Sequence, residues 1–145
     1  VSINSDGSYA VISKYSDNSN TGAAYVYTRS GSTWTQQAIL TASDGATNDR
    51  FSYGVAISHN GSYIIAGANG KNSNAGAAYV FKRSGSTWTQ QRKITSSDTQ
   101  ASDYFGAAVS ISGESEYIII SGHREDGGSG DPKADAGAAY IYEAG

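Results

Sequence analysis

The sequence predicts an all-β protein made of β-propeller blades, which are four-stranded antiparallel sheets repeated along the chain. The motif Gly-Ala-Ala-Tyr begins at Gly22, Gly76 and Gly137, which are separated by 54 and then 61 residues. Only 16% of the 145 residues are charged, whereas Gly and Tyr number 18 and 11, a composition that disfavours long helices. Self-similarity at this period, in short apolar runs separated by turn residues, is typical of propeller blades.

The repeat divides the chain into three units of residues 1–54, 55–108 and 109–145. The third unit is incomplete because it stops before a fourth strand, and it contains seven extra residues between its second and third strands. Further residues keep the spacing of 54 and serve as structural markers of the repeat: Trp34 and Trp88, Asp49 and Asp103, Phe51 and Phe105.

Each element of a unit has its own signal, most clearly in the second unit. Four strands are predicted there, at residues 55–58, 63–66, 77–82 and 87–94. Asn60-Gly61 joins the first two strands, because these residues tolerate the positive φ that a tight hairpin turn needs. Ser84-Gly85-Ser86 joins the third and fourth strands. The second strand is a continuous apolar run, as at residues 118–120, which predicts burial on both of its faces.

Three units are too few for a closed ring, since propellers have about 4 to 8 blades. Three interpretations follow. The chain is a piece of a longer propeller, or copies of it assemble to complete one, or the architecture is another kind of β-repeat. An open stack of blades exposes sheet faces and a strand edge, which natural proteins avoid.

The motifs resemble a known family. Phe105-Gly106 matches the Phe-Gly element of FG-GAP repeats, the blades of integrin-α-type propellers, and residues 67–69 approximate the Gly-Ala-Pro element. With Thr-Trp-Thr-Gln-Gln and Asp-x-Phe, the chain is similar to tandem FG-GAP-like repeats of microbial, algal and viral surface proteins. The resemblance implies adhesion or surface display, at an extracellular, cell-surface or virion-surface location.

The family's calcium loops do not carry over to this chain. They lie between the first two strands of a blade, where this chain has only tight turns such as residues 59–61. Calcium needs six to eight oxygen ligands, which so short a turn does not supply.

The acidic insertion in the third unit raises the question of calcium again. Its carboxylates are spaced by glycines, so they form either a calcium site or a plain solvated loop: Glu125, Asp126, Asp131 and Asp135. Basic and imidazole groups flank them and complete a predicted binding loop: His123, Arg124 and Lys133.

Residues that occur once per unit have a structural interpretation beside a functional one. The repeated aspartates are expected to cap turns by accepting backbone N–H bonds, with metal or ligand contact as the alternative: Asp44, Asp49, Asp98 and Asp103. The repeated tryptophans and tyrosines are expected to pack between blades, with a stacking surface for sugars as the alternative: Trp34, Trp88, Tyr25, Tyr79 and Tyr140.

Several function classes are disfavoured. The chain has no Cys, which excludes disulfides, thiol catalysis and cysteine-ligated metal sites. No nucleophile elbow, zinc-helix or phosphate-loop motif occurs, so no catalytic residue is predicted. A net charge of −3 without a basic stripe disfavours nucleic acid, and the absence of a long apolar run disfavours membrane insertion.

Three hypotheses for function remain. The first is a non-catalytic module that binds a protein or glycan surface ligand, with contacts from the inter-strand loops and above all from residues 123–135. The second is a structural building block of a fibre, capsid or matrix. The third is a scaffold for a hydrolase whose catalytic residues lie elsewhere. Further blades of the same longer chain, or other copies, are the expected structural partners.

Overall fold

A computed structural model describes residues 1–98, 100–113, 115–124 and 136–144, and within them the strands form three antiparallel sheets. Blade 1 contains β1 (Ser2–Ile3), β2 (Tyr9–Lys14), β3 (Ala23–Ser30) and β4 (Thr33–Leu40). Blade 2 contains β5 (Phe51–Ile57), β6 (Tyr63–Ala68), β7 (Ala77–Ser84) and β8 (Thr87–Ile94). Blade 3 contains β9 (Phe105–Ile111), β10 (Tyr117–Gly122) and β11 (Ala138–Glu143). The prediction of an all-β chain of propeller-like blades is confirmed.

Strands that follow one another in the chain also pair side by side, which gives each blade an up-and-down order. The bulges repeat too: the pairing of the third and fourth strands shifts after Val26 in blade 1 and after Val80 in blade 2. Strand β8 has the predicted bounds, but β5 begins at Phe51, before the predicted start at Val55. The reason is a bulge, through which Phe51 pairs with Ala68 before regular pairing resumes at Val55.

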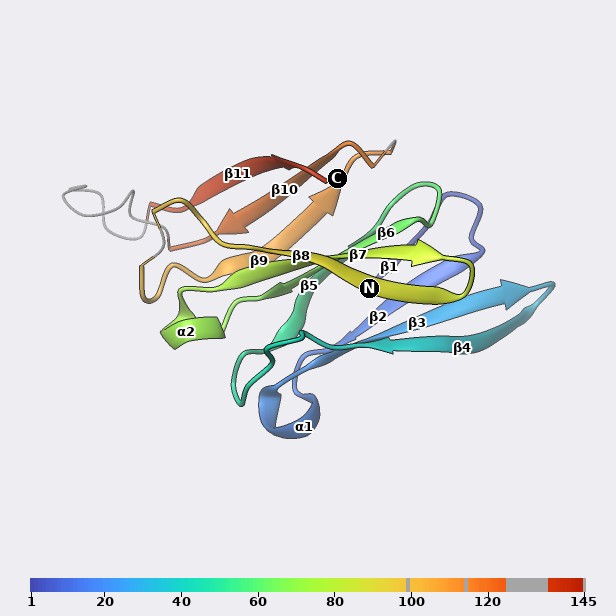
Figure 1. The fold of residues 1–145 in the computed structure, drawn as a ribbon, viewed down its shortest axis with the longest axis horizontal. Helices are drawn as coiled ribbons and strands as arrows, with labels where there is room; N and C mark the ends of the chain where they lie inside the picture. Colours follow the sequence, from blue (N-terminus) through green and yellow to red (C-terminus); the bar gives the residue numbers. More distant parts are fainter. Residues whose placement is uncertain (99, 114, 125–135, 145) are drawn as a thin grey trace.

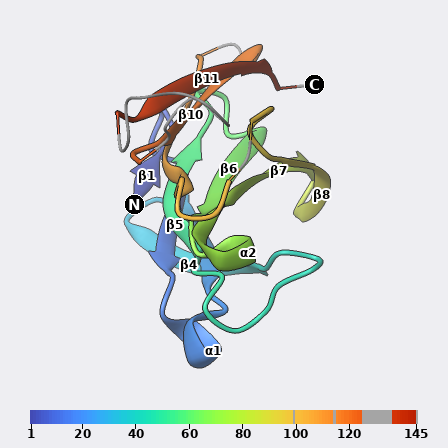
Figure 2. The same ribbon diagram turned by 90° about the vertical axis from the view of Figure 1, so that its left-hand side faces the viewer.

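The three blades stack face to face in chain order, with blade 1 at the bottom and blade 3 at the top of Figure 1 and in the same order in Figure 2. We call the face that carries the Tyr of Gly-Ala-Ala-Tyr the tyrosine face, and the opposite one the aliphatic face. The tyrosine face of blade 2 packs on blade 1, and its aliphatic face packs on blade 3. Tyr79 on one face and Ile65 on the other are both fully buried.

A backbone contact joins each blade to the next. The carbonyls of residues 19–21 accept hydrogen bonds from the N–H groups of Asn48, Arg50 and Phe51, at 2.8–3.3 Å. Residues 73–75 do the same for Ser102, Tyr104 and Phe105, at 2.7–3.2 Å. The contact therefore recurs with the period of the repeat.

Two short turns supply these carbonyls, and sequence reasoning did not predict them. They are α1 (Asp17–Asn20) and α2 (Lys71–Asn74), in which Asn72, Ser73 and Asn74 have positive φ values of 50°, 59° and 66°. Gly76, which follows α2, approaches blade 3 so closely that a Cβ atom on it would lie 2.0 Å from the carbonyl oxygen of Phe105. Only glycine fits there. No helix in the described part of the chain has the length and apolar character to span a membrane.

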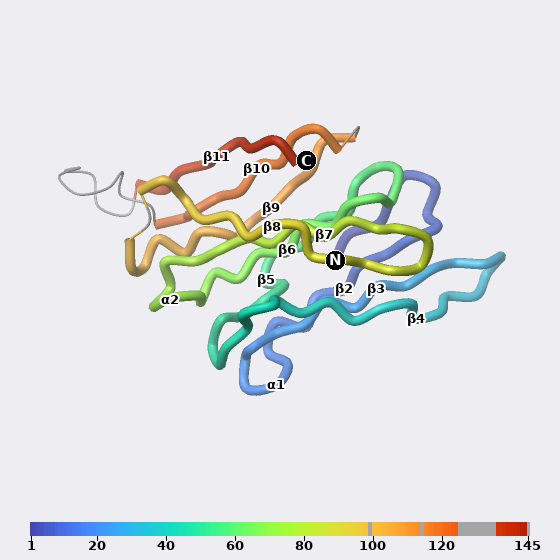
Figure 3. Tube along the Cα trace, in the orientation of Figure 1, coloured from blue at the N-terminus to red at the C-terminus, as the bar shows by residue number. Residues whose placement is uncertain are grey.

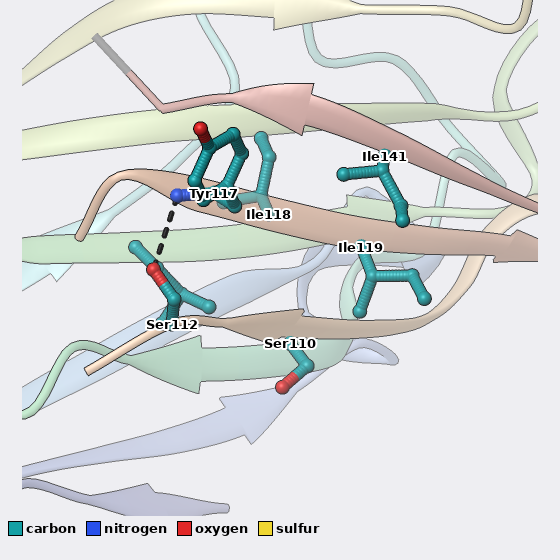
Figure 4. Close-up of a pocket in the computed structure, with 7 residues that line it drawn as sticks. Ser110, Ser112, Tyr117, Ile118, Ile119 and Ile141 are labelled. Carbon is teal, nitrogen blue, oxygen red and sulfur yellow. Dashed lines mark hydrogen bonds between the residues drawn. The ribbon is translucent and has the colours of Figure 1, made fainter. Parts of the chain in front are cut away.

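Two sheet faces lie open at the ends of the stack. On the tyrosine face of blade 1, Ile12 is 42% exposed, and on the aliphatic face of blade 3, Ile119 and Ile141 are 42% and 71% exposed. Figure 4 shows these two isoleucines next to each other on the paired strands β10 and β11. The prediction that residues 118–120 are buried on both faces is therefore wrong for Ile119, because no described sheet covers that side of blade 3.

Candidate interaction surface

Within the described residues, the inter-strand connections other than tight hairpins gather at one end of the stack, which we call the loop end. Here β2, β6 and β10 finish and β5 and β9 begin, because antiparallel neighbours bring the end of one strand beside the start of the other. Figure 3 shows α1, α2 and the β4–β5 connection at this end, away from the β3–β4 and β7–β8 hairpins. The described part of the predicted binding loop, at residues 123–124, lies here as well.

Aromatic side chains gather at the loop end, some of them exposed and one half-buried. Tyr15 and Tyr53 lie with ring centroids 5.2 Å apart and are 46% and 44% exposed. Tyr104 stacks on His123 at 4.9 Å with an interplanar angle of 30°. The Arg124 guanidinium lies 5.5 Å from the centroid of the Tyr104 ring, within the range of a cation–π interaction.

Two of the residues predicted for the binding loop thus belong to an aromatic cluster. The backbone N–H of Arg124 also donates to the carbonyl of Asp103, at 3.4 Å. The other predicted loop residues lie outside the described residues: Glu125, Asp126, Asp131, Lys133 and Asp135. Among the residues that are described, no group of three or more His, Asp or Glu side chains could hold a metal ion.

Sequence reasoning missed the three tyrosines of this surface. The sequence motifs were sought among residues that repeat, whereas the residue types at these positions differ between units. Tyr15 corresponds to Asn69 and His123, and Tyr104 corresponds to Arg50. Variation at fixed positions of a repeat was the available signal, because loops that carry specificity differ while the strands that support them stay the same.

A polar cluster lies between blades 1 and 2, around Asp44 of the β4–β5 connection. The Asp44 carboxylate accepts hydrogen bonds from the Tyr79 hydroxyl and the Lys93 ammonium, both at 2.7 Å. Burial by itself raises the pKa of Asp44, but the bonds from Lys93 and Tyr79 and the charge of Lys71 outweigh it and lower that pKa to about 2. Burial and the Asp44 carboxylate together raise the pKa of the Tyr79 hydroxyl.

Asp44 is therefore not the turn cap that its repetition suggested. Its oxygens bind side chains of the following blade, and the equivalent Asp98 likewise accepts a hydrogen bond from the Tyr140 hydroxyl at 2.7 Å. These aspartates connect blades, a role that depends on contacts with residues far along the chain.

Asp49 and Asp103 do accept backbone hydrogen bonds within their turns. Asp49 receives the N–H of Ala46 at 2.7 Å, and Asp103 receives that of Gln100. Asp49 has an additional partner, the buried Lys71 ammonium, at 2.7 Å. Lys71 also donates to the backbone carbonyl of Asp44, and the Asp44 carboxylate lies 3.6 Å away. Together with the Asp49 carboxylate, three oxygens surround the Lys71 ammonium.

The repeated tryptophans occupy different surroundings. Trp88 lies against blade 1, where its indole N–H donates to Gln37 at 3.0 Å and its ring meets the Tyr9 ring edge-on at 6.5 Å. Trp34, its equivalent in blade 1, is 40% exposed. The repeated tryptophan thus packs between blades in blade 2, which follows another blade, and is partly exposed in blade 1, which follows no described blade. The other aromatic markers, Phe51 and Phe105, are fully buried.

Comparison with known proteins agrees with this architecture. A profile of the FG-GAP repeat family matches residues 34–81 and 88–142. The chain belongs to the FG-GAP repeat family. Each matched FG-GAP segment begins near the start of the outer strand of one blade and continues into the next blade, so the family's repeat spans a junction between sheets. No curated protein matches the chain.

Proposed function

We propose that this FG-GAP chain is a non-catalytic recognition module of an extracellular or virion-surface protein. It binds a protein or glycan on another surface through its loop end. The observation that carries the proposal is the cluster of half-buried Tyr104 with exposed His123 and Arg124, and the Tyr15–Tyr53 pair at the same end.

The chemistry of this surface suits recognition. Tyrosine offers a large contact area with few rotatable bonds, and Tyr and Arg are enriched at protein interfaces. The rings also give flat apolar faces beside polar atoms, on which a partner's apolar surface can rest. The blades beneath hold these groups on a rigid support, since β5 and β9 begin directly at the cluster.

The proposal is tested by binding measurements with matched variants. The chain is screened for glycan and cell-surface binding, and Tyr104→Ala and Arg124→Ala are compared with Lys82→Ala. Lys82 is a fair control because it is also a cation over a tyrosine, 5.4 Å from the Tyr63 ring, but at the opposite end of the blade. We expect the loop-end variants to weaken binding at least tenfold and Lys82→Ala to leave it unchanged. Equal loss in all three variants contradicts the proposal.

The second candidate function is a structural building block of a fibre, capsid or matrix. The observation that favours it is the pair of open apolar sheet faces, one at each end of the stack. Ordered filaments or shells in electron micrographs of the purified chain, together with no ligand binding at the loop end, would support this alternative over recognition.

A further inference from the structure

We propose that two copies of this chain dock end to end, with the aliphatic face of blade 3 in one copy covering the tyrosine face of blade 1 in the other. The partner is a second copy, since the open tyrosine face of one copy is complementary to the open aliphatic face of another. Within the chain, the tyrosine face of one blade already packs on the aliphatic face of the blade before it, between blades 1 and 2 and between blades 2 and 3. The two open faces are one of each kind.

The aliphatic faces correspond position by position. Ile119 and Ile141 of blade 3 are the repeat equivalents of Ile65 and Val80 of blade 2, which blade 3 buries completely. Ala139 is likewise equivalent to the fully buried Ala78. The outer face of blade 3 therefore has the small and branched side chains that accept a tyrosine face.

The tyrosine faces correspond in the same way. Ile12, Tyr25 and Tyr27 of blade 1 are the equivalents of Ala66, Tyr79 and Phe81 of blade 2, whose exposed fractions are 0%, 0% and 4%. In blade 2 these bulky rings pack on small residues of the neighbouring sheet, namely Val11, Ala24 and Val26. If two tyrosine faces met, bulky rings would lie against bulky rings and pack poorly. Close packing therefore favours the pairing of a tyrosine face with an aliphatic face.

An arginine at the rim is already in position for the contact. In blade 2, Arg83 donates from Nε to the carbonyl of Gly61 and from Nη1 to that of Gly85, and its guanidinium lies 4.4 Å from the Tyr9 ring centroid of blade 1. Arg29 makes the same two bonds, to Gly7 and Gly31. The equivalent of Tyr9 is Tyr117 on blade 3.

Tyr117 is 51% exposed, and Trp34, which is equivalent to the Trp88 that packs on Tyr9, is 40% exposed. End-to-end docking would place Tyr117 of one copy against Arg29 and Trp34 of the other, which reproduces the internal arrangement of three residues.

Two copies supply enough blades for a closed ring. The three sheets of the described residues make six blades in two copies, within the range of about 4 to 8 that closes a propeller. Contacts between unlike surfaces generate rings when the rotation closes, and a two-fold axis along the channel would make the two junctions identical.

The first measurement is the mass of the 145-residue chain by light scattering over a concentration series. We expect a discrete species of about twice the 15.1 kDa of one chain. A single chain at every concentration overturns the proposal, and so does a continuous series of larger masses, since the latter means that the ring does not close.

Substitutions then test which faces meet. Ile141→Asp and Ile12→Asp are each expected to give monomers, while a mixture of the two re-forms dimers through the one junction whose faces are both intact. Tyr53→Asp at the loop end is the control and should remain dimeric. These positions are exposed in the single chain, and circular dichroism checks that every variant is folded. A dimer that survives Ile12→Asp alone shows pairing of like faces and overturns the proposal, as does a mixture that stays monomeric.

Discussion

The junction between blades 1 and 2 and the junction between blades 2 and 3 share a backbone but differ in side-chain chemistry. At the first junction the β4–β5 connection carries two ion pairs with blade 2, from Lys71 to Asp49 and from Lys93 to Asp44, both at 2.7 Å. Among the described residues none crosses the second, where Arg92 instead donates to the carbonyl of Glu143 at 2.8 Å. Both junctions keep the backbone contact and one Asp–Tyr hydrogen bond. These two features therefore recur at both junctions, whereas the ion pairs are found at the first.

The closest approach between the sheets also differs. At the second junction Gly67 lies against Gly106, and a Cβ atom on Gly67 would be 1.9 Å from the Gly106 carbonyl oxygen. At the first junction serines occupy both equivalent positions, with Ser13 and Ser52 hydroxyls 3.2 Å apart and Ser52 donating to Ala23 at 2.6 Å. Backbone contact at one junction therefore corresponds to a side-chain hydrogen-bond network at the other.

The largest expected effect comes from exchanging these residues. Gly67→Ser should destabilise the chain by about 3 kcal/mol, because the new side chain collides with the backbone of Gly106 and overpacking forces the sheets apart. Ser13→Gly should cost about 1 kcal/mol, the loss of its hydrogen bond. Urea denaturation measures both. Similar losses in the two variants would show that the junctions have the same spacing after all.

The next comparison concerns the buried charge. Asp49→Asn removes the carboxylate nearest to Lys71 and leaves a buried ammonium poorly compensated, so we expect a loss of about 3 kcal/mol. Asp103→Asn removes a turn-capping acceptor and should cost about 1 kcal/mol. Chemical denaturation of the two variants side by side gives the difference. A smaller loss for Asp49→Asn than for Asp103→Asn would contradict the importance of Lys71.

The shared Asp–Tyr hydrogen bond should give equal effects at the two junctions. Tyr79→Phe and Tyr140→Phe each delete a hydroxyl that donates to a carboxylate, and each should cost about 1.5 kcal/mol. Thermal unfolding of both variants tests the prediction. If one substitution were neutral while the other destabilised, the bond would not be a common requirement of the repeat.

The smallest effect is the pH dependence of the first junction. The pKa of Asp44 is lowered from 3.8 to about 2, so its stabilising contribution is present above pH 3.8 and is lost as the pH falls towards 2. Because Asp44 is partly exposed, we expect less than about 1 kcal/mol. The measurement is the stability difference between the wild type and Asp44→Asn, which should shrink below pH 4. A difference that stays constant with pH would contradict this contribution.

Sequence periodicity predicted the strands well, because apolar alternation and turn residues are local signals. Strand β8 was predicted residue for residue, and the extended start of β5 was missed since it depends on a bulge in its pairing with β6. The role of Lys71 could not be predicted either. Its equivalent in the first unit is Asp17, and its partners lie 22 and 27 residues earlier in the chain, so neither the repeat nor the local sequence marks it.

The candidate surface was only partly predictable for a related reason. His123 and Arg124 were predicted as binding residues because they belong to the loop lengthened by seven extra residues in the third unit. Tyr104 is recognisable only from its contacts in the structure. It directly precedes β9, and its ring contacts with His123 and Arg124 arise because β10 ends beside the start of β9.

The backbone contact between blades has a consequence for how such a chain grows. Its acceptor carbonyls and donor N–H groups are only 29 or 30 residues apart in the chain. Each of the first two 54-residue units therefore contains one set of acceptors and one set of donors. A tandem duplication of one period, wherever it begins, carries both halves of the contact with it. The new blade can therefore join its neighbour without compensating changes elsewhere, and during synthesis each sheet can be fastened to the next as soon as it leaves the ribosome.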